Sequence, residues 1–172
     1  GKKKIVLKEE WMVGFITTWI VGLLAHAYRF FNFLPIWDSI YNFTGVGSTY
    51  TLGRWFLGYA GLITSMFDLP WVNGAFSLFY ISIVVILLTE MFEIKNKGMI
   101  VLCAAIFVSF PTVVSSFAYM YTADAYLLAF LLATLAVYLT WCVKKWGTIA
   151  GMVCLAFAMV IYQEYATVAI VL

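Results

Sequence analysis

Five long apolar runs constrain the fold of this chain more than any other feature. They cover Trp11–Ala27, Trp71–Phe92, Met99–Tyr119, Ala125–Val143 and Thr148–Leu172. Each approaches the roughly 20 residues that an α-helix needs to cross the hydrocarbon core of a bilayer. Hydrophobic residues make up 65% of the sequence and charged residues only 10%, which excludes a water-soluble domain. The sequence therefore predicts an integral membrane protein with about five transmembrane helices.

The apolar runs lack the alternating pattern of membrane β-strands. Helices are then the only structure that satisfies the backbone polar groups in lipid, so we expect an all-α polytopic bundle. We treat residues 1–172 as a single transmembrane domain. Because the sequence stops at Leu172 inside an apolar run, we expect this domain to be the N-terminal portion of a longer polytopic protein.

The basic residues predict the orientation of the bundle. With five spans, eight of the ten lysines and arginines fall on one side of the membrane: Lys2, Lys3, Lys4, Lys8, Lys95, Lys97, Lys144 and Lys145. Short loops rich in lysine stay in the cytoplasm, so we predict a cytoplasmic N-terminus. A rival topology, with Leu52–Phe67 as a further span, would put Lys95 and Lys97 outside, and we reject it.

Segment 28–69 then faces outward, and its length of about forty residues greatly exceeds that of an ordinary connection. We predict that Leu52–Phe67 within it forms a re-entrant or interfacial helix against the outer leaflet. Trp55 and Tyr59 suit the headgroup zone there.

Asp38 and Arg54 are the main candidates for chemistry in this outward segment. Asp38 follows Pro35 and Trp37, where partial loss of water would favour a usable general base. The alternative is that it caps a helix that begins at Ser39. Arg54 has a planar guanidinium that binds phosphate at two points, or it anchors the chain at the headgroups.

Further outward side chains could bind substrate. Tyr41 and Tyr50 could pack on a sugar ring, or they could serve as interfacial anchors. Asp124 is either the N-cap of the following helix or a second acid near Asp38. Glu164 lies well inside the fifth apolar run, where a lipid-facing charge costs on the order of 3 kcal/mol. We therefore expect Glu164 to face a polar cavity, with Arg29 or Arg54 as its counter-charge.

Other functional classes find little support. Cys103, Cys142 and Cys154 are interpreted as reduced packing residues, and His26 as a satisfied residue near the outer end of the first span. No phosphate-binding loop, dinucleotide motif or nucleic-acid-binding stripe is present, so no nucleic-acid partner is expected. The net charge of +2 follows from the cytoplasmic lysines.

Several short motifs together resemble a known family. They are Asp38 soon after the first span, a stretch rich in Gly, Tyr and Thr that leads to Gly53-Arg54-Trp55, then Asp124-Ala-Tyr126, and finally Tyr162-Gln163. This arrangement resembles the Gtr-type bacterial glucosyltransferases, which are membrane enzymes of the GT-C class. The resemblance covers most of the chain.

The resemblance implies an enzyme of the bacterial inner membrane that moves a sugar, glucose in this family, from a polyprenyl-phosphate donor to a cell-surface glycan acceptor outside. The catalytic acid of GT-C enzymes lies in the first outer loop, which corresponds to Asp38. Many relatives carry paired acids here, whereas Asp38 is followed by Ser39. This difference leaves the need for a divalent metal open, and no metal ligand is assigned.

Two alternatives remain from other classes. A transporter or flippase would use Glu164 and Arg54 in a pathway open to both sides, but the cytoplasmic halves of the spans are nearly free of ionisable groups. A non-catalytic membrane subunit is the other alternative. It would pack through small residues such as Gly14, Gly22, Gly147 and Gly151.

Overall fold

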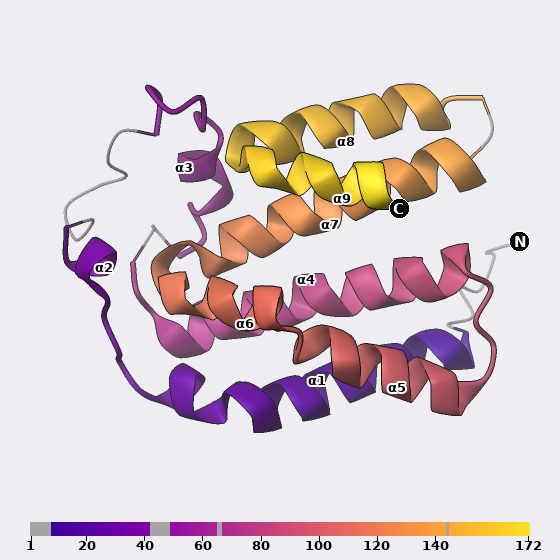
Figure 1. Cartoon of the computed structure of the whole chain (residues 1–172), viewed down its shortest axis with the longest axis horizontal. Coiled ribbons are helices and arrows are strands. Elements are labelled where there is room, and N and C mark those ends of the chain that lie inside the picture. Colours follow the sequence, from indigo (N-terminus) through magenta and orange to yellow (C-terminus); the bar gives the residue numbers. More distant parts are fainter. Residues whose placement is uncertain (1–7, 42–48, 65–66, 144) are drawn as a thin grey trace, which may run out of the picture.

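The computed structural model describes residues 8–41, 49–64, 67–143 and 145–172, and every regular element in these ranges is a helix (Figure 1). The prediction of an all-helical bundle is confirmed for this part of the chain. The elements are α1 (Glu9–Phe31), α2 (Trp37–Tyr41), α3 (Leu57–Ala60), α4 (Pro70–Met91), α5 (Lys97–Val108), α6 (Pro111–Ser116), η2 (Phe117–Tyr119), α7 (Met120–Cys142), α8 (Gly147–Ile161), η3 (Gln163–Tyr165) and α9 (Ala166–Val171).

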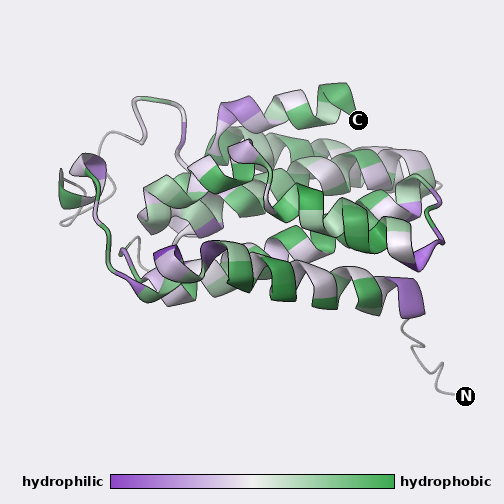
Figure 2. Ribbon diagram, turned by 60° about the horizontal axis from the view of Figure 1, so that its bottom comes forward, coloured by the Kyte–Doolittle hydropathy of each residue, from purple (hydrophilic) through white to green (hydrophobic). Residues whose placement is uncertain are grey.

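Three helical runs are long and apolar enough to cross a membrane, which indicates a multi-pass membrane protein. They are Glu9–Phe31, Pro70–Met91 and the run Pro111–Cys142, which comprises α6, η2 and α7. The helices α5 and α8 are apolar but shorter. The predicted count of five full spans is therefore confirmed only in part. Figure 2 shows that hydrophobic residues follow the lengths of the helices, while hydrophilic colour gathers mainly toward their ends.

Helices α4 and α7 lie at the centre of the bundle. Helix α7 packs against α4 and α8, and α1 packs against α4 and α5. Glycines allow the close approach of α8 to α7. A Cβ atom on Gly147 would lie 2.1 Å from the carbonyl oxygen of Leu139, and one on Gly151 would lie 2.7 Å from that of Ala136. The four-residue spacing of these glycines thus serves packing within the chain.

The predicted helix over Met99–Tyr119 is divided at Pro111. Helix α5 ends at Val108, Phe110 adopts an extended conformation with ψ of 139°, and Pro111 begins α6. Proline lacks the N–H of a helix interior and disfavours helical geometry in the residue before it, but it is tolerated at the first helical position. Two helical pieces and η2 therefore cover this run.

The predicted fifth span over Thr148–Leu172 is not a single helix. Helix α8 ends at Ile161, and Tyr162 is extended, with φ of −157° and ψ of 113°. After η3, the chain reverses, and α9 runs back alongside α8 (Figure 1). The break falls at the polar sequence Tyr162-Gln163-Glu164-Tyr165. Placing these side chains at the end of α8 avoids burying Glu164 in lipid.

The predicted interfacial helix over Leu52–Phe67 is reduced to the one-turn helix α3 and flanking turns within the described residues. Leu57 and Ala60 are buried against α7 and α8, and the Phe56 amide donates to the carbonyl oxygen of Val160 at 3.2 Å. Trp55 and Tyr59 remain exposed. This segment covers one end of the bundle.

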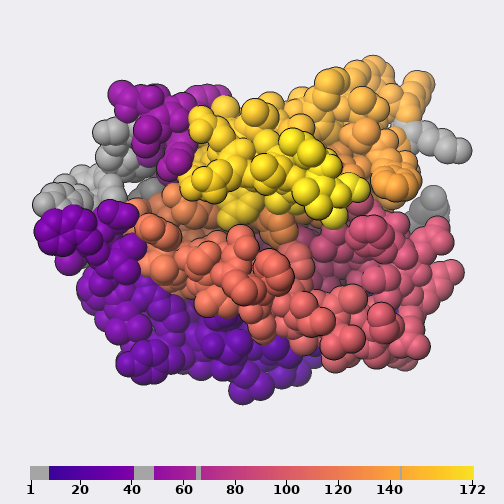
Figure 3. All heavy atoms as spheres, in the orientation of Figure 1, coloured from indigo at the N-terminus to yellow at the C-terminus, as the bar shows by residue number. Residues whose placement is uncertain are grey.

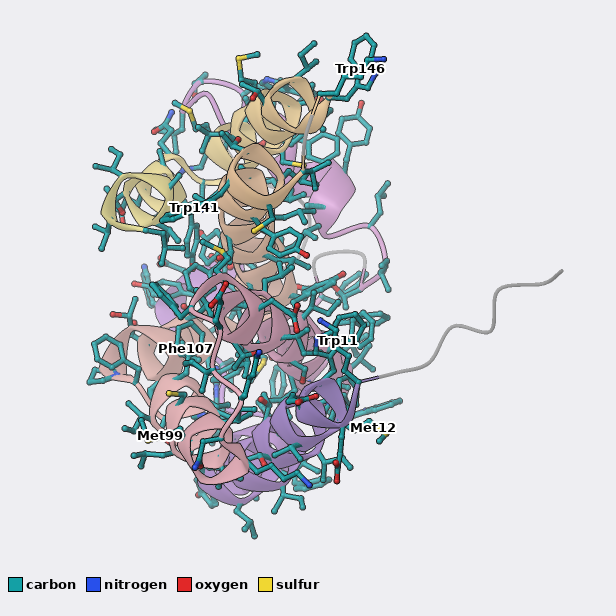
Figure 4. All side chains as sticks on the ribbon, turned by 90° about the vertical axis from the view of Figure 1, so that its right-hand side faces the viewer. Trp11, Met12, Met99, Phe107, Trp141 and Trp146 are labelled. Atoms are coloured by element: carbon teal, nitrogen blue, oxygen red, sulfur yellow. The ribbon has the colours of Figure 1, made fainter. Side chains whose placement is uncertain are left out.

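The lysine-bearing connections share the opposite end. Lys8 forms an ion pair with Glu90 at 2.7 Å, and Lys97 forms one with Glu9. The α7–α8 connection reaches the same end (Figure 1), as the predicted topology requires. Figure 4 views the bundle from this end and shows Trp146 at its rim. Lys2, Lys3, Lys4 and Lys144 lie outside the described residues.

Candidate functional site

A pocket of about 480 Å³ lies at the end of the bundle away from the lysines. It brings together three of the charged residues singled out from the sequence, Asp38, Arg54 and Glu164. These come from α2, the turn before α3, and η3. Hydroxyl-bearing residues complete much of its wall: Thr112, Ser115, Ser116, Tyr119, Tyr121, Tyr126, Tyr162, Tyr165 and Thr167. The pocket thus combines acids, a cation and many hydroxyl groups.

Arg54 is held by the turn that precedes it. The Arg54 amide donates to the carbonyl oxygen of Thr49 at 2.8 Å, and Gly53 donates to that of Tyr50 at 3.1 Å. Gly53 has a φ of +73°, a conformation that glycine adopts at little cost. The side-chain amide of Gln163 donates to the carbonyl oxygen of Leu52 at 3.1 Å, which joins this turn to η3.

The guanidinium of Arg54 lies over the ring of Tyr162, 4.3 Å from the ring centroid. A cation in this position is attracted by the electron-rich face of the ring. The Nε atom of Arg54 is buried and has no hydrogen-bond partner among the described residues. A guanidinium with an unused donor beside a pocket is suited to bind an anion.

Asp38 lies in the first turn of α2, which begins at Trp37. Asp38 is therefore inside the helix, and the alternative prediction that it caps a helix starting at Ser39 is wrong. The α2 turn is fixed instead by Ser39, whose hydroxyl donates to the carbonyl oxygen of Ile36 at 2.8 Å and accepts from the Ile36 amide at 2.9 Å. Asp38 contributes its side chain to the pocket wall.

Glu164 is exposed at the pocket, at the end of the bundle. Among the described residues it forms an ion pair with neither Arg29 nor Arg54, so the predicted counter-charge is not found. Tyr165 in the same connection is largely buried, and this burial raises the pKa of its hydroxyl to about 12. The Tyr165 hydroxyl therefore stays protonated and can donate a hydrogen bond at neutral pH.

Asp124 lies apart from the pocket lining. Helix α7 begins at Met120, so Asp124 is inside the helix and is not its N-cap. Its side chain is 2% exposed and accepts hydrogen bonds from Thr64 at 3.0 Å and from Asn73 at 3.2 Å. These contacts connect α7 to α4 and to the segment after α3, which is a structural role.

One of the two tyrosines proposed for sugar contact, Tyr50, is not part of the pocket lining. Tyr50 is 72% exposed and lines a shallow aromatic hollow with Trp55, Phe56 and Tyr59. The backbone of Tyr41 closes α2, but its side chain is outside what the structure describes.

Arg29 and His26 stabilise the α1 end of the bundle. The guanidinium of Arg29 donates to the carbonyl oxygens of Phe117, Leu34 and Ala118, which ties α1 to η2. His26 contacts the carbonyl oxygen of Val108 at 2.9 Å, so its interpretation as a satisfied residue is confirmed. The three cysteines are free.

Sequence reasoning assigned no site role to the serine and threonine side of the pocket. Ser115, Ser116 and Thr112 come from α6, Tyr119 from η2 and Tyr126 from α7. A pattern was present, because Thr112, Ser115 and Ser116 are polar residues spaced three and four apart after Pro111 and so share one helix face. Their meeting with η3 depends on the chain reversal, which the sequence pattern did not predict.

No group of three or more residues of the types His, Cys, Asp and Glu lies close enough to hold a metal ion among the described residues. The carboxylates of Asp38 and Glu164 are the acidic groups of the pocket. They are the oxygen ligands that the pocket could offer to a hard divalent cation.

The fold and the pocket define a multi-pass helical membrane protein with an acid-and-cation site at one end of its bundle. A comparison with protein families then identifies the family within this class. The family model described as "Glucosyl transferase GtrII" matches residues 27–172, and the chain belongs to that family. Membership implies hexosyltransferase activity. No curated protein and no solved structure matches the chain.

Proposed function

We propose that this chain transfers a glucosyl group from a polyprenyl-phosphate carrier to a glycan acceptor at the outer face of the bacterial inner membrane. The single observation that carries the proposal is the convergence of Asp38, Arg54 and Glu164 on one hydroxyl-rich pocket. The glucosyl transferase family supports the reaction type. The identity of the donor, the identity of the acceptor and the side of the membrane are parts of the proposal that go beyond the family match.

The proposed chemistry uses Asp38 as general base. An acceptor hydroxyl attacks the anomeric carbon of the donor glucose, and the new carbon–oxygen bond forms as the bond to the carrier phosphate breaks. The hydroxyl proton passes to the Asp38 carboxylate. General-base assistance of this kind contributes typically 10²–10⁴-fold to the rate.

Arg54 stabilises the departing polyprenyl phosphate in this scheme. Two negative oxygens of the phosphate accept hydrogen bonds from the guanidinium, whose Nε is without a partner among the described residues. Glu164 and the pocket hydroxyls orient the sugar through its hydroxyl groups. A site of this polarity suits a carbohydrate, because each sugar hydroxyl needs a donor or acceptor once it leaves water.

The test is transfer from a polyprenyl-phosphate glucose donor by purified protein in lipid nanodiscs. We expect Asp38→Asn to lower kcat by at least about 100-fold, because the amide cannot accept the acceptor proton, while the variant still inserts and accumulates. Ile40→Ala, at an exposed position of the same helix, is the control for damage to α2 and should keep wild-type turnover. Wild-type turnover by Asp38→Asn would exclude Asp38 as the base.

A transporter remains the second candidate class, since Arg54 and Glu164 could bind a translocated anion. The same nanodisc protein, reconstituted into sealed vesicles, distinguishes the two. Movement of the polyprenyl-phosphate glucose across the bilayer without covalent transfer would favour transport over the proposed reaction.

A further inference from the structure

Three cavities lie next to one another along one face of the bundle. The polar pocket shares Thr112, Ser116, Phe130 and Tyr165 with a second cavity of about 220 Å³. This second cavity shares Phe107 and Phe110 with a third of about 400 Å³, between α4 and α5. Figure 3 shows the face on which α9, α6 and α5 follow one another. These shared side chains place the three cavities in a row, which we call the path, that leads from the polar pocket along the bundle.

A file of aromatic rings follows the path from its charged end. Arg54 lies over Tyr162, and the Tyr162 ring lies 5.8 Å from that of Tyr165. Tyr165 lies 5.8 Å from Phe130, which stacks on Phe107 at 5.4 Å with an interplanar angle of 16°. Phe107, labelled in Figure 4, belongs to α5. The rings change from tyrosine to phenylalanine along this file, so the path becomes apolar with distance from Arg54.

The third cavity is lined almost entirely by apolar side chains. Val85, Leu88, Ile106 and Phe110 are among them, and Ile106 and Phe110 are 57% and 54% exposed on the bundle surface. The division of the α5–α6 run at Pro111 places the junction of the second and third cavities at Phe110. A ligand with a charged head and a long flexible hydrocarbon would match both ends of the path.

We infer that the second and third cavities form a groove that binds the isoprenoid chain of the donor while its phosphate meets Arg54. This inference rests on the proposed function, because it takes the same phosphate-linked donor. It assigns a binding site to Phe107, Phe110 and Cys103, residues that contribute nothing to the polar pocket. Each isoprene unit that lies in the groove adds van der Waals contacts with the lining side chains, which makes chain length a determinant of donor binding.

Cys103 provides a test that does not require turnover. It is half-buried and lines the third cavity, whereas Cys154 on α8 lines none of the three cavities. One protein retains Cys103 alone through Cys142→Ala and Cys154→Ala, and its matched control retains Cys154 alone. We expect long-chain polyprenyl phosphate to slow the reaction of Cys103 with a small uncharged maleimide by about fivefold or more, leaving Cys154 unaffected.

Kinetics with two donors give a second measurement. Phe110→Ala should raise the KM for a long-chain donor by about fivefold, because the van der Waals contacts between the ring and the chain are lost. The KM for a short-chain donor and the kcat for both donors should not change. Leu102→Ala is the matched control, since Leu102 is 51% exposed on α5 and lines none of the three cavities. An equal rise in KM for both donors would overturn the inference.

Phosphatidic acid separates the inferred occupant from an ordinary bilayer lipid. If it protects Cys103 as well as polyprenyl phosphate does, or if neither protects it, the groove is not a site for the isoprenoid chain. Protection by polyprenyl phosphate in a protein that transfers no glucose would support the groove and count against the proposed function. The two failures are therefore distinguishable.

Discussion

At the scale of single residues, Arg54 combines a backbone and a side chain that are held in place with a guanidinium nitrogen that has no hydrogen-bond partner among the described residues. The Thr49 carbonyl, the Tyr162 ring and the Gly53 turn fix its position, yet Nε has no partner among the described residues. A guanidinium held this way presents a planar fork, which a lysine ammonium cannot reproduce.

We expect Arg54→Ala to reduce kcat/KM by roughly 100-fold and Arg54→Lys by roughly tenfold, because lysine keeps the charge but loses the bidentate geometry. Steady-state transfer in nanodiscs measures both. Trp55→Phe tests the neighbouring interfacial position and should leave kcat/KM unchanged. Equal activities of the two Arg54 variants would mean that Arg54 only anchors the segment at the headgroups.

Asp68 is an acid whose burial works against stability. Both carboxylate oxygens are buried and have no hydrogen-bond partner among the described residues. Burial raises the pKa of Asp68, and the nearby positive charge of Arg29 lowers it by less. A raised carboxyl pKa in the folded state means that the free energy of unfolding falls as pH rises from the unfolded pKa, near 3.8, through the folded pKa.

Asp68→Asn should therefore raise Tm by roughly 2 °C at neutral pH, because it removes a partly buried charge. The gain should shrink toward zero as the pH falls below the folded pKa, where Asp68 is protonated in both states. Thermal unfolding in detergent at several pH values provides the measurement, with Glu93→Gln as an exposed control. A gain that persists unchanged at acidic pH would point to a cause other than this charge.

At the scale of elements, the contact between α7 and α8 depends on glycine. The close approach at Gly151 leaves no room for a side chain, since a Cβ atom would lie 2.4 Å from the Thr140 hydroxyl and 2.7 Å from the Ala136 carbonyl oxygen. The contact also holds η3 beside the pocket, because α8 leads directly into it.

Gly151→Leu should lower the free energy of unfolding by about 2 kcal/mol, because the two helices must separate to fit the added side chain. Ala150→Leu, one residue earlier and only half-buried, is the matched control. Unfolding titrations in mixed micelles report the difference between them. If both substitutions cost the same, α8 does not depend on this close contact.

Helix position was largely predictable, but helix continuity was not. The apolar runs predicted α1 and α4 to within a few residues, because lipid requires helix wherever a run is apolar. Pro111 could have marked the division of the third run. The break at Tyr162 could not be found in this way, because no proline or glycine stands there. It depends on polar contacts such as the one from Gln163 to Leu52.

At the scale of the whole molecule, the site is an outcome of how the helix ends assemble. Asp38, Arg54 and Glu164 were predicted as site residues one by one, from residue type and from family resemblance. Their meeting in one pocket needs α2, the Arg54 turn and η3 to converge at one end of the bundle. The sequence separation of Asp38 and Glu164 gives no information on that convergence. Asp124 was an equally plausible acid from the sequence, yet its hydrogen bonds to Thr64 and Asn73 stabilise helix packing.

The charge distribution of the assembled bundle makes a topological prediction. The ion pairs Lys8–Glu90 and Lys97–Glu9 mark one end, and the pocket marks the other. Short lysine-rich connections stay in the cytoplasm, so the pocket should open at the outer face. In proteins with one cysteine, a membrane-impermeant maleimide added to intact spheroplasts should label Tyr50→Cys, which is exposed near the pocket, but not the exposed Cys142 at the other end.

Inside-out vesicles supply the reciprocal measurement, and there Cys142 should react while residue 50 does not. Labelling at least about tenfold faster from the predicted side would establish the orientation, because an impermeant reagent reaches the far side only through leaks. The reversed pattern would place Asp38 and Arg54 in the cytoplasm. The charge asymmetry would then have failed to orient the bundle, and the proposed acceptor could not be a glycan outside the cell.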